Sequence, residues 1–365
     1  MSDLTTLDVV TEVHGRLGCI TLNRPKALNA LSLDMVRTLT QALQQWQSDP
    51  YILAVVVRGQ GKEGPFGAFC AGGDIRFFHQ AALAGDSRLG DFFTEEYALN
   101  HLIHTYSKPY IAFMDGIVMG GGMGISQGAS LRVVTERTKM AMPETNIGLF
   151  PDVGGGYFLS RCPGAIGEYL GLTGHMMGAA QALAAHLADG FIDSGRLVNI
   201  WQTLISTPFE TGQAVEHWVR SQFGRLEVTA FPARAQIDAV FSKATVAEIV
   251  QILESATDTW SQETAKVLRH RSPLMLLVVL KQIRRARQMS LADDLRMERD
   301  MVHHCFHLRA TQASETVEGI RALAVDKDHT PRWQPAQIEA VEGDEVDAFF
   351  VSPWPAAEHP LASLS

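Results

Sequence analysis

Cysteine, basic residues and long apolar runs are what this sequence has little of. The four cysteines are widely scattered and form no metal-type pair; they are Cys19, Cys70, Cys162 and Cys305. No uninterrupted apolar run reaches the roughly 18 residues of a membrane span. Lysine and arginine number 31 against 40 acidic residues, a net charge of −9. This balance gives no support to nucleic acid or an anionic membrane as a general partner.

Several common signatures are also missing. The segment from Met1 to Asp8 carries acids and no basic residue, so it matches neither a secretory signal nor an Arg-rich transit peptide. Together with the scattered cysteines, this favours a reducing, cytoplasmic location. The turn at Gly122-Met-Gly124 lacks the third glycine of a dinucleotide-binding site, because Gln127 stands there. No Walker A sequence, His-Glu-x-x-His zinc motif or Gly-x-Ser-x-Gly elbow occurs.

The pattern of apolar residues predicts an α/β protein. A chain of 365 residues, 46% of them hydrophobic, can bury a large core as one domain or as one domain plus a satellite. Short β-branched runs alternate with helical patterns in the first half, and the later part is mostly helical. The expected strands are 19–22, 53–57, 109–114 and 131–135, and the expected helices are 32–47, 95–106, 213–222, 246–256, 272–287 and 292–309. We therefore expect a core over 1–195, a mainly helical region over 196–335 and an irregular tail over 336–365.

Glycine-rich turns and two acids are the most informative features that are present. Backbone without side chains can approach a ligand closely in Cys70-Ala-Gly-Gly-Asp74 and Met119-Gly-Gly-Gly-Met-Gly124, and can aim its N–H groups at an oxygen. Further on, the segment from Met142 to Tyr157 sets Glu144 and Asp152 among glycines and apolar residues. Two acids and two groups of N–H donors suggest acyl chemistry.

Taken together, these segments resemble the crotonase (enoyl-CoA hydratase/isomerase) superfamily. The resemblance begins at Leu22-Asn-Arg-Pro-Lys-Ala-Leu-Asn-Ala-Leu31, continues through Phe69-Cys-Ala-Gly-Gly-Asp-Ile-Arg76 and Glu95-Glu-Tyr97, and is densest from Gly116 to Arg161. It reappears from Glu318 to Asp328. The resemblance implies a crotonase-like spiral of repeated ββα turns instead of a doubly wound sheet, and an acyl-CoA ester as the ligand.

The resemblance also implies roles for single residues. The backbone N–H groups of Gly73 and Gly121 would hold the thioester oxygen, on which hydrolysis develops negative charge. Glu144 would attack the thioester or activate water, and Asp152 would contact a 3-hydroxyl group of the substrate. The other implied contacts are Glu96 and Gly120 with the substrate, and Lys26, Ala71, Asp74 and Lys327 with coenzyme A.

The acids separate the branches of this superfamily. The hydratases that the chain resembles use two glutamates, and the first of them lies three residues beyond the oxyanion glycine, where this chain has Gly124. Asp152 stands where hydratases usually carry glycine, and Phe150-Pro-Asp-Val-Gly-Gly-Gly156 resembles the 3-hydroxyisobutyryl-CoA hydrolases of valine catabolism. The sequence therefore favours a thioesterase. An enoyl-CoA hydratase or isomerase that uses Glu144 alone, and a non-catalytic acyl-CoA-binding protein, stay open as alternatives.

Simpler structural roles also stay open at this stage. The glycines could serve tight turns alone, Glu144 and Asp152 could be a helix cap and a turn acid, and Glu96 could lie on a solvated helix face. As for cofactors, the resemblance implies none, with coenzyme A as part of the substrate, and we expect no metal. We also expect no nucleic-acid or membrane partner. The resemblance allows a homo-oligomer, since crotonase relatives often form trimers.

Overall fold

The computed structural model describes residues 7–227 and 231–365, which form two compact units. Unit 1 contains the described parts of Met1–Gly73, Ala98–Met140 and Met176–Ala230. Unit 2 contains Asp74–Tyr97, Ala141–His175 and Phe231–Ser365. Each unit gathers segments that are far apart in the sequence, so the units run across the contiguous division at residues 195 and 335.

A six-stranded sheet forms the centre of unit 1, in the order β1-β2-β3-β4-β6-β8. The strands are β1 (Val9–His14), β2 (Leu17–Leu22), β3 (Ala54–Gly59), β4 (Tyr110–Met114), β6 (Leu131–Val134) and β8 (Gly190–Phe191). β1 and β2 are antiparallel, and the other pairs of this sheet are parallel. β3 and β4 are almost entirely apolar and buried, as is typical of parallel strands covered on both faces. The strands of this sheet follow one another in chain order, without the reversal of a doubly wound sheet, as the resemblance implies.

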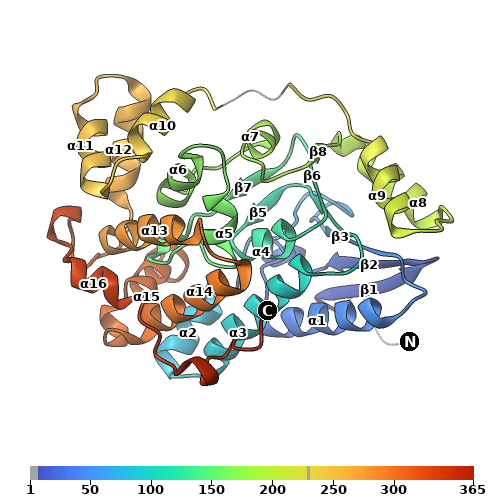
Figure 1. The fold of residues 1–365 in the computed structure, drawn as a ribbon, viewed down its shortest axis with the longest axis horizontal. Coiled ribbons are helices and arrows are strands. Elements are labelled where there is room, and N and C mark those ends of the chain that lie inside the picture. Colours follow the sequence, from blue (N-terminus) through green and yellow to red (C-terminus); the bar gives the residue numbers. More distant parts are fainter. Residues whose placement is uncertain (1–6, 228–230) are drawn as a thin grey trace. The chain divides into compact units, whose positions relative to one another are not determined.

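Helices cover the sheet of unit 1 (Figure 1). α1 (Leu33–Ser48) begins after Ser32, whose hydroxyl accepts a hydrogen bond from the Met35 N–H at 3.3 Å. α8 (Leu197–Ser206) and α9 (Gly212–Ser221) are neighbours in Figure 1 and pack Trp201 and Val215 into one apolar cluster with sheet residues. The remaining elements here are α4 (Gly121–Gln127), α7 (Ala179–Ala184) and the two-stranded sheet of β5 (Ile117–Met119) and β7 (Lys139–Ala141).

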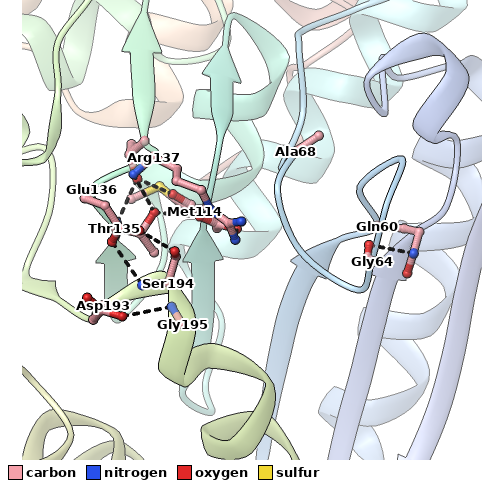
Figure 2. A network of polar contacts seen from close by, with 12 residues as sticks. Gln60, Gly64, Ala68, Met114, Thr135, Glu136, Arg137, Asp193, Ser194 and Gly195 are labelled. Carbon is pink, nitrogen blue, oxygen red and sulfur yellow. Dashed lines mark hydrogen bonds and ion pairs between the residues drawn. The ribbon is translucent and has the colours of Figure 1, made fainter.

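Polar contacts fix the segments that follow β4, β6 and β8 (Figure 2). The Thr135 hydroxyl donates to Asp115 Oδ1 at 2.6 Å, and Arg137 pairs with the same carboxylate. The Ser194 N–H donates to Glu136 Oε2 at 3.0 Å. These contacts tie together the carboxyl ends of three adjacent parallel strands.

Unit 2 is mainly helical. Its helices are α2 (Ile75–Ala84), the first part of α3 (Arg88–His104), α5 (Gly155–Ser160), α6 (Ile166–Thr173), α10 (Arg234–Phe241), α11 (Val246–Ser255), α12 (Thr259–His270), α13 (Pro273–Ala286), α14 (Leu291–His307), α15 (Glu315–Ile320) and α16 (Gly343–Ala348). α13 packs against α5 and α6, and α14 packs against α5 and α15. The short helix α5 is therefore held by two long helices from the end of the chain.

Most of the expected elements are present with shifted ends. The strand expected over 109–114 is β4, and the helices expected over 32–47 and 292–309 are α1 and α14. The helix expected over 95–106 begins earlier, at Arg88. The stretch 336–365, expected to be irregular, contains α16 and buries Phe349 and Leu361.

Two sequence observations concern membranes and targeting. None of the helices in the described parts of the chain has the length and apolar character to cross a bilayer. The targeting interpretation of Met1 to Asp8 falls mostly on residues 1–6, which lie outside the described residues.

Candidate active site

A group of buried carboxyl groups in unit 2 is the first part of the candidate site. Glu144 begins the 3-10 helix η3 (Glu144–Ile147), directly after Pro143, and its side chain is buried. Its Oε2 atom has no hydrogen-bond partner among the described residues. A buried oxygen without a partner needs an explanation, and contact with a ligand is one.

Asp152 and Glu96 lie in the same unit. The Tyr97 hydroxyl donates to Asp152 Oδ2 at 2.8 Å, and both side chains are buried. Glu96, the neighbour of Tyr97 on α3, is only 2% exposed. This burial excludes a solvated helix face for Glu96. Tyr97 belongs to the motif Glu95-Glu-Tyr97, but no pattern in the sequence signals its contact with an acid beyond α3.

Burial raises the pKa of all three acids. For Glu96, burial has the largest effect, and the charges of Asp152 and Glu144 add to it. For Glu144, burial and then the charge of Asp152 raise the pKa well above its usual range. Burial raises the pKa of Asp152 to about 6, although the hydrogen bond from Tyr97 acts in the opposite direction. Buried carboxyl groups whose charges act on one another, and whose pKa values are raised, suit acid–base or nucleophilic chemistry.

The two glycine-rich turns lie beside each other in unit 1. Cys70 forms an isolated parallel bridge with Val118 in β5, and the Met119 N–H donates to the Cys70 carbonyl at 3.0 Å. A side-chain carbon placed on Gly72 would lie 3.8 Å from the Gly121 nitrogen. The two candidate donor segments are therefore neighbours.

The helix start at Gly121 leaves a donor available. Gly121 is the first residue of α4, so its N–H has no partner within the helix. Gly120 precedes it with a φ of 46°, in the left-handed region that favours glycine. Gly73, the other candidate, bridges to Leu31 and directly precedes Asp74, the cap of α2.

Asn29 organises this part of unit 1, a role that the sequence did not predict. Its side chain is fully buried and accepts a hydrogen bond from the Arg24 N–H at 2.8 Å. The same side chain donates to the carbonyls of Ala68 and Phe69 at 2.9 and 3.1 Å. Asn29 thereby ties the segment Leu22–Leu31 to the residues just before the Cys70 turn.

The four candidate contacts for coenzyme A differ in how they are used inside the protein. Lys26 and Lys327 are exposed. The Ala71 N–H donates to the Leu28 carbonyl at 3.0 Å, so this donor is already engaged. The Asp74 side chain caps α2.

The predicted residues therefore form one group in each unit. Unit 1 holds Gly73, Gly120, Gly121, Lys26 and Ala71, and unit 2 holds Glu96, Glu144, Asp152, Asp74 and Lys327. In unit 2 the three acids come together. In unit 1 the two glycine turns come together.

Comparison with known proteins assigns the chain to a family, in agreement with the resemblance noted in its sequence. A family model described as enoyl-CoA hydratase/isomerase matches residues 17–350. The chain belongs to the enoyl-CoA hydratase/isomerase family. Among its curated relatives is the mitochondrial 3-hydroxyisobutyryl-CoA hydrolase of Gallus gallus, 38% identical over 94% of this chain and 88% of the relative. The probable 3-hydroxyisobutyryl-CoA hydrolase 3 of Arabidopsis thaliana is 40% identical over 94% of this chain and 91% of the relative.

Solved structures of this family share the fold over almost the whole chain. A structure described as a carnitinyl-CoA dehydratase from Mycobacterium thermoresistibile has a TM-score of 0.85 and 36% identity, and covers 98% of this chain and 99% of that one. A structure described as an enoyl-CoA hydratase from Rhodobacter sphaeroides has a TM-score of 0.82 and 36% identity, over 95% and 98% of the two chains. The crotonase fold expected from the sequence is confirmed.

Position 124 differs from the hydratase pattern of this enoyl-CoA hydratase/isomerase family, because it is a glycine. Gly124, where the resemblance places the first hydratase glutamate, is buried within α4. In unit 2 the chain buries Glu96, Glu144 and Asp152 near one another instead.

Proposed function

We propose that this chain is an acyl-CoA thioester hydrolase that acts on a short 3-hydroxyacyl-CoA, preferably 3-hydroxyisobutyryl-CoA, and releases coenzyme A and the 3-hydroxy acid. The observation that carries the proposal is the buried group of Glu96, Glu144 and Asp152, in a chain with glycine at position 124. The relatives named 3-hydroxyisobutyryl-CoA hydrolase support the same activity, at 38% and 40% identity over 94% of the chain.

Glu144 carries the central step of the proposed reaction. By one route, its carboxylate attacks the thioester carbon, the C–S bond breaks, and the thiolate takes up a proton to leave as coenzyme A. Water then cleaves the resulting anhydride and restores Glu144. By the other route, Glu144 removes a proton from water as the water oxygen adds to the same carbon. The C–S bond then breaks, and the proton passes to the sulfur as coenzyme A leaves. Both routes consume one water for each thioester.

The other proposed residues bind and orient the substrate. The N–H groups of Gly73 and Gly121 stabilise the negative charge on the thioester oxygen. Asp152 accepts a hydrogen bond from the substrate 3-hydroxyl group, and Glu96 and Gly120 contact the acyl part. In the same proposal, coenzyme A is contacted by Lys26, Ala71, Asp74 and Lys327.

Hydrolysis by this scheme uses water and no cofactor. We propose a cytoplasmic location because the four cysteines are few and widely scattered along the sequence. The chicken relative is named as mitochondrial, and the Arabidopsis relative is not. Cell fractionation tests the location, and light scattering tests whether the chain forms a homo-oligomer.

A second candidate is an enoyl-CoA hydratase or isomerase that uses Glu144 as a single base. The descriptions of the two solved structures as a dehydratase and a hydratase favour this candidate. The absence of an acid at Gly124 counts against hydration, which in the hydratases that this chain resembles uses two glutamates.

One assay separates the two candidates. Thiol appearance from 3-hydroxyisobutyryl-CoA is measured beside the loss of enoyl absorbance from crotonyl-CoA, with the same enzyme sample. We expect thiol release to be much faster than hydration. Fast hydration without thiol release would overturn the proposed hydrolase.

A further inference from the structure

The loop that carries Asp152 has an unfavourable backbone conformation. Val153, the next residue, has a φ of 58° and is buried. A β-branched residue in the left-handed region is a rare outlier, because its side chain crowds the backbone. Such conformations persist only where surrounding contacts hold them, and they cluster at functional sites.

A second set of buried polar groups surrounds this loop. The Glu298 carboxylate, on α14, accepts hydrogen bonds from the Gly154 N–H at 2.7 Å and from the Gly156 N–H at 2.9 Å. Gln282, on α13, donates through Nε2 to the Pro151 carbonyl at 2.7 Å and to Glu298 Oε1 at 3.0 Å. Glu298 and Gln282 are both fully buried. Hydrogen bonds from buried side chains therefore hold the backbone both before and after Asp152.

Asp294 completes the set one helical turn before Glu298. Its Oδ2 atom accepts a hydrogen bond from the Tyr157 N–H at 2.8 Å. A Cβ on Gly156 would collide with the Asp294 carboxylate, so the closeness of these carboxylates to the loop requires glycine there. The glycine run after Asp152 is thus shaped to receive side-chain acceptors from α14.

We propose that Glu298, assisted by Gln282 and Asp294, is a positioning residue that holds the loop 151–157 so that Asp152 faces the substrate. This inference rests on the proposed function, in which Asp152 binds the substrate 3-hydroxyl. Glu298 does not touch the substrate in this scheme. It acts through the Gly154 and Gly156 amides after Val153, while Gln282 holds the Pro151 carbonyl before it. Tyr97 fixes the Asp152 side chain itself.

The carboxyl group of Glu298 is suited to this role because both of its oxygens accept hydrogen bonds from the loop. Two backbone N–H groups donate to Glu298, one to each oxygen, and Gln282 Nε2 also donates to Oε1. In Glu298→Gln the side chain keeps its size, but one of its two ends becomes an N–H donor that faces another donor. The substitution therefore breaks one contact with the loop and leaves the packing volume unchanged.

The first experiment follows the loop and does not depend on catalysis. In Glu298→Gln we expect hydrogen exchange at the amides of Gly154, Gly156 and Tyr157 to become at least tenfold faster. Glu168→Gln is the matched control, because Glu168 is equally buried in the same unit and pairs with Arg287 instead of the loop. Exchange that does not change in Glu298→Gln overturns the proposal.

The second experiment asks whether the loop matters for catalysis. With 3-hydroxyisobutyryl-CoA, we expect Glu298→Gln to lower kcat at least tenfold and to leave KM within a few fold. In an Asp152→Asn background, adding Glu298→Gln should lower kcat by less than a further threefold. The effect is small there because a residue that acts through Asp152 no longer has the carboxylate to position. An equal decrease in kcat in both backgrounds would mean a general structural role for Glu298 and would overturn the proposal. Faster hydrogen exchange with an unchanged kcat would also overturn it.

Two further provisions keep the test decisive. If Glu298→Gln does not fold, Gln282→Met removes the donor to Pro151 and leaves Glu298 in place, and the same exchange and rate changes are expected. A parent enzyme that releases no thiol overturns the proposed function, and the hold on the loop is then judged by hydrogen exchange alone.

Discussion

At the scale of single residues, Glu144 and Asp152 are two buried acids with different surroundings. Asp152 is held by the Tyr97 hydroxyl, whereas one oxygen of Glu144 has no partner in the described part of the chain. The unpartnered oxygen suits the group that reacts, and the held carboxylate suits the group that recognises. The two proposed roles follow from this difference.

Glu144→Gln tests the reacting role. The substitution keeps the size of the side chain and removes the nucleophile or base, so we expect turnover to fall at least 100-fold and the affinity for a coenzyme A ester to stay within a few fold. Steady-state rates and ester binding measure the two effects, with Glu168→Gln as the control. A variant that keeps more than about a tenth of the activity, a barrier change below about 1.4 kcal/mol, would exclude the role.

Tyr97→Phe tests the electrostatics of Asp152 through the pH profile. The Tyr97 hydrogen bond lowers the pKa of Asp152, which burial raises to about 6. Removing the donor therefore raises this pKa, and a reaction that needs ionised Asp152 loses activity at a higher pH than in the parent. We expect the acid limb of kcat/KM to move upward, with smaller changes near pH 8.

The control for this shift is Tyr106→Phe. The Tyr106 hydroxyl donates to the Leu43 carbonyl at 2.7 Å, and both residues belong to unit 1, whereas the proposed acids belong to unit 2. This variant should leave the acid limb in place. An acid limb that stays fixed or moves to lower pH in Tyr97→Phe would show that Asp152 does not govern it.

At the scale of elements, the proposed oxyanion site depends on how closely α4 and β5 approach the Cys70 turn. A Cβ on Gly122 would collide with the Cys70 carbonyl, which is backbone and cannot rotate away. We expect Gly122→Ala to push the two segments apart, to lower kcat at least tenfold and to reduce the melting temperature by several degrees.

Gly178→Ala is the matched control for this change. Gly178 caps α7 and a Cβ there would meet nothing within 4 Å. Comparing the rates and melting curves of the two variants should therefore distinguish the effect of moving α4 away from the Cys70 turn from a general effect of losing a glycine. Near-parent kcat in a folded Gly122→Ala variant would mean that the spacing of these segments does not matter for the reaction.

Prediction from the sequence succeeded where a local pattern decides the structure. The helix expected over 32–47 is α1, in which Val36, Leu39 and Leu43 are buried at helical spacing and Ser32 caps the start. The acids Glu144 and Asp152 stood out because they lie among glycines and apolar residues. Local chemistry is enough in these cases.

Prediction from the sequence failed where distant segments meet. Glu298 and Asp294 lie on the buried face of α14 together with Leu295 and Val302, and an acid on an apolar stripe is a signal that could have found them. Their targets, the Gly154 and Tyr157 amides, lie far away in the sequence. The pattern of residues within α14 does not predict which distant segment these acids contact.

At the scale of the whole molecule, the acidic chain and its proposed ligand have the same sign of charge. The net charge is −9, and coenzyme A is a polyanion. At physiological ionic strength the Debye length is about 8 Å, so distant acidic residues are screened and nearby cations decide the interaction with phosphate groups. The proposed contacts Lys26 and Lys327 are exposed and available for such pairing.

The salt dependence of KM tests this balance between local and distant charges. If the two lysines hold phosphate groups, KM for 3-hydroxyisobutyryl-CoA should rise at least threefold between 50 and 500 mM salt, with little change in kcat. Lys26→Gln and Lys327→Gln should each raise KM about two- to fivefold at low salt and flatten its salt dependence, as expected for exposed ion pairs. Lys266→Gln, at another exposed lysine, should do neither. A KM that falls as salt is added would mean that repulsion from the acidic surface dominates, and the phosphate groups would then have to be held by other residues.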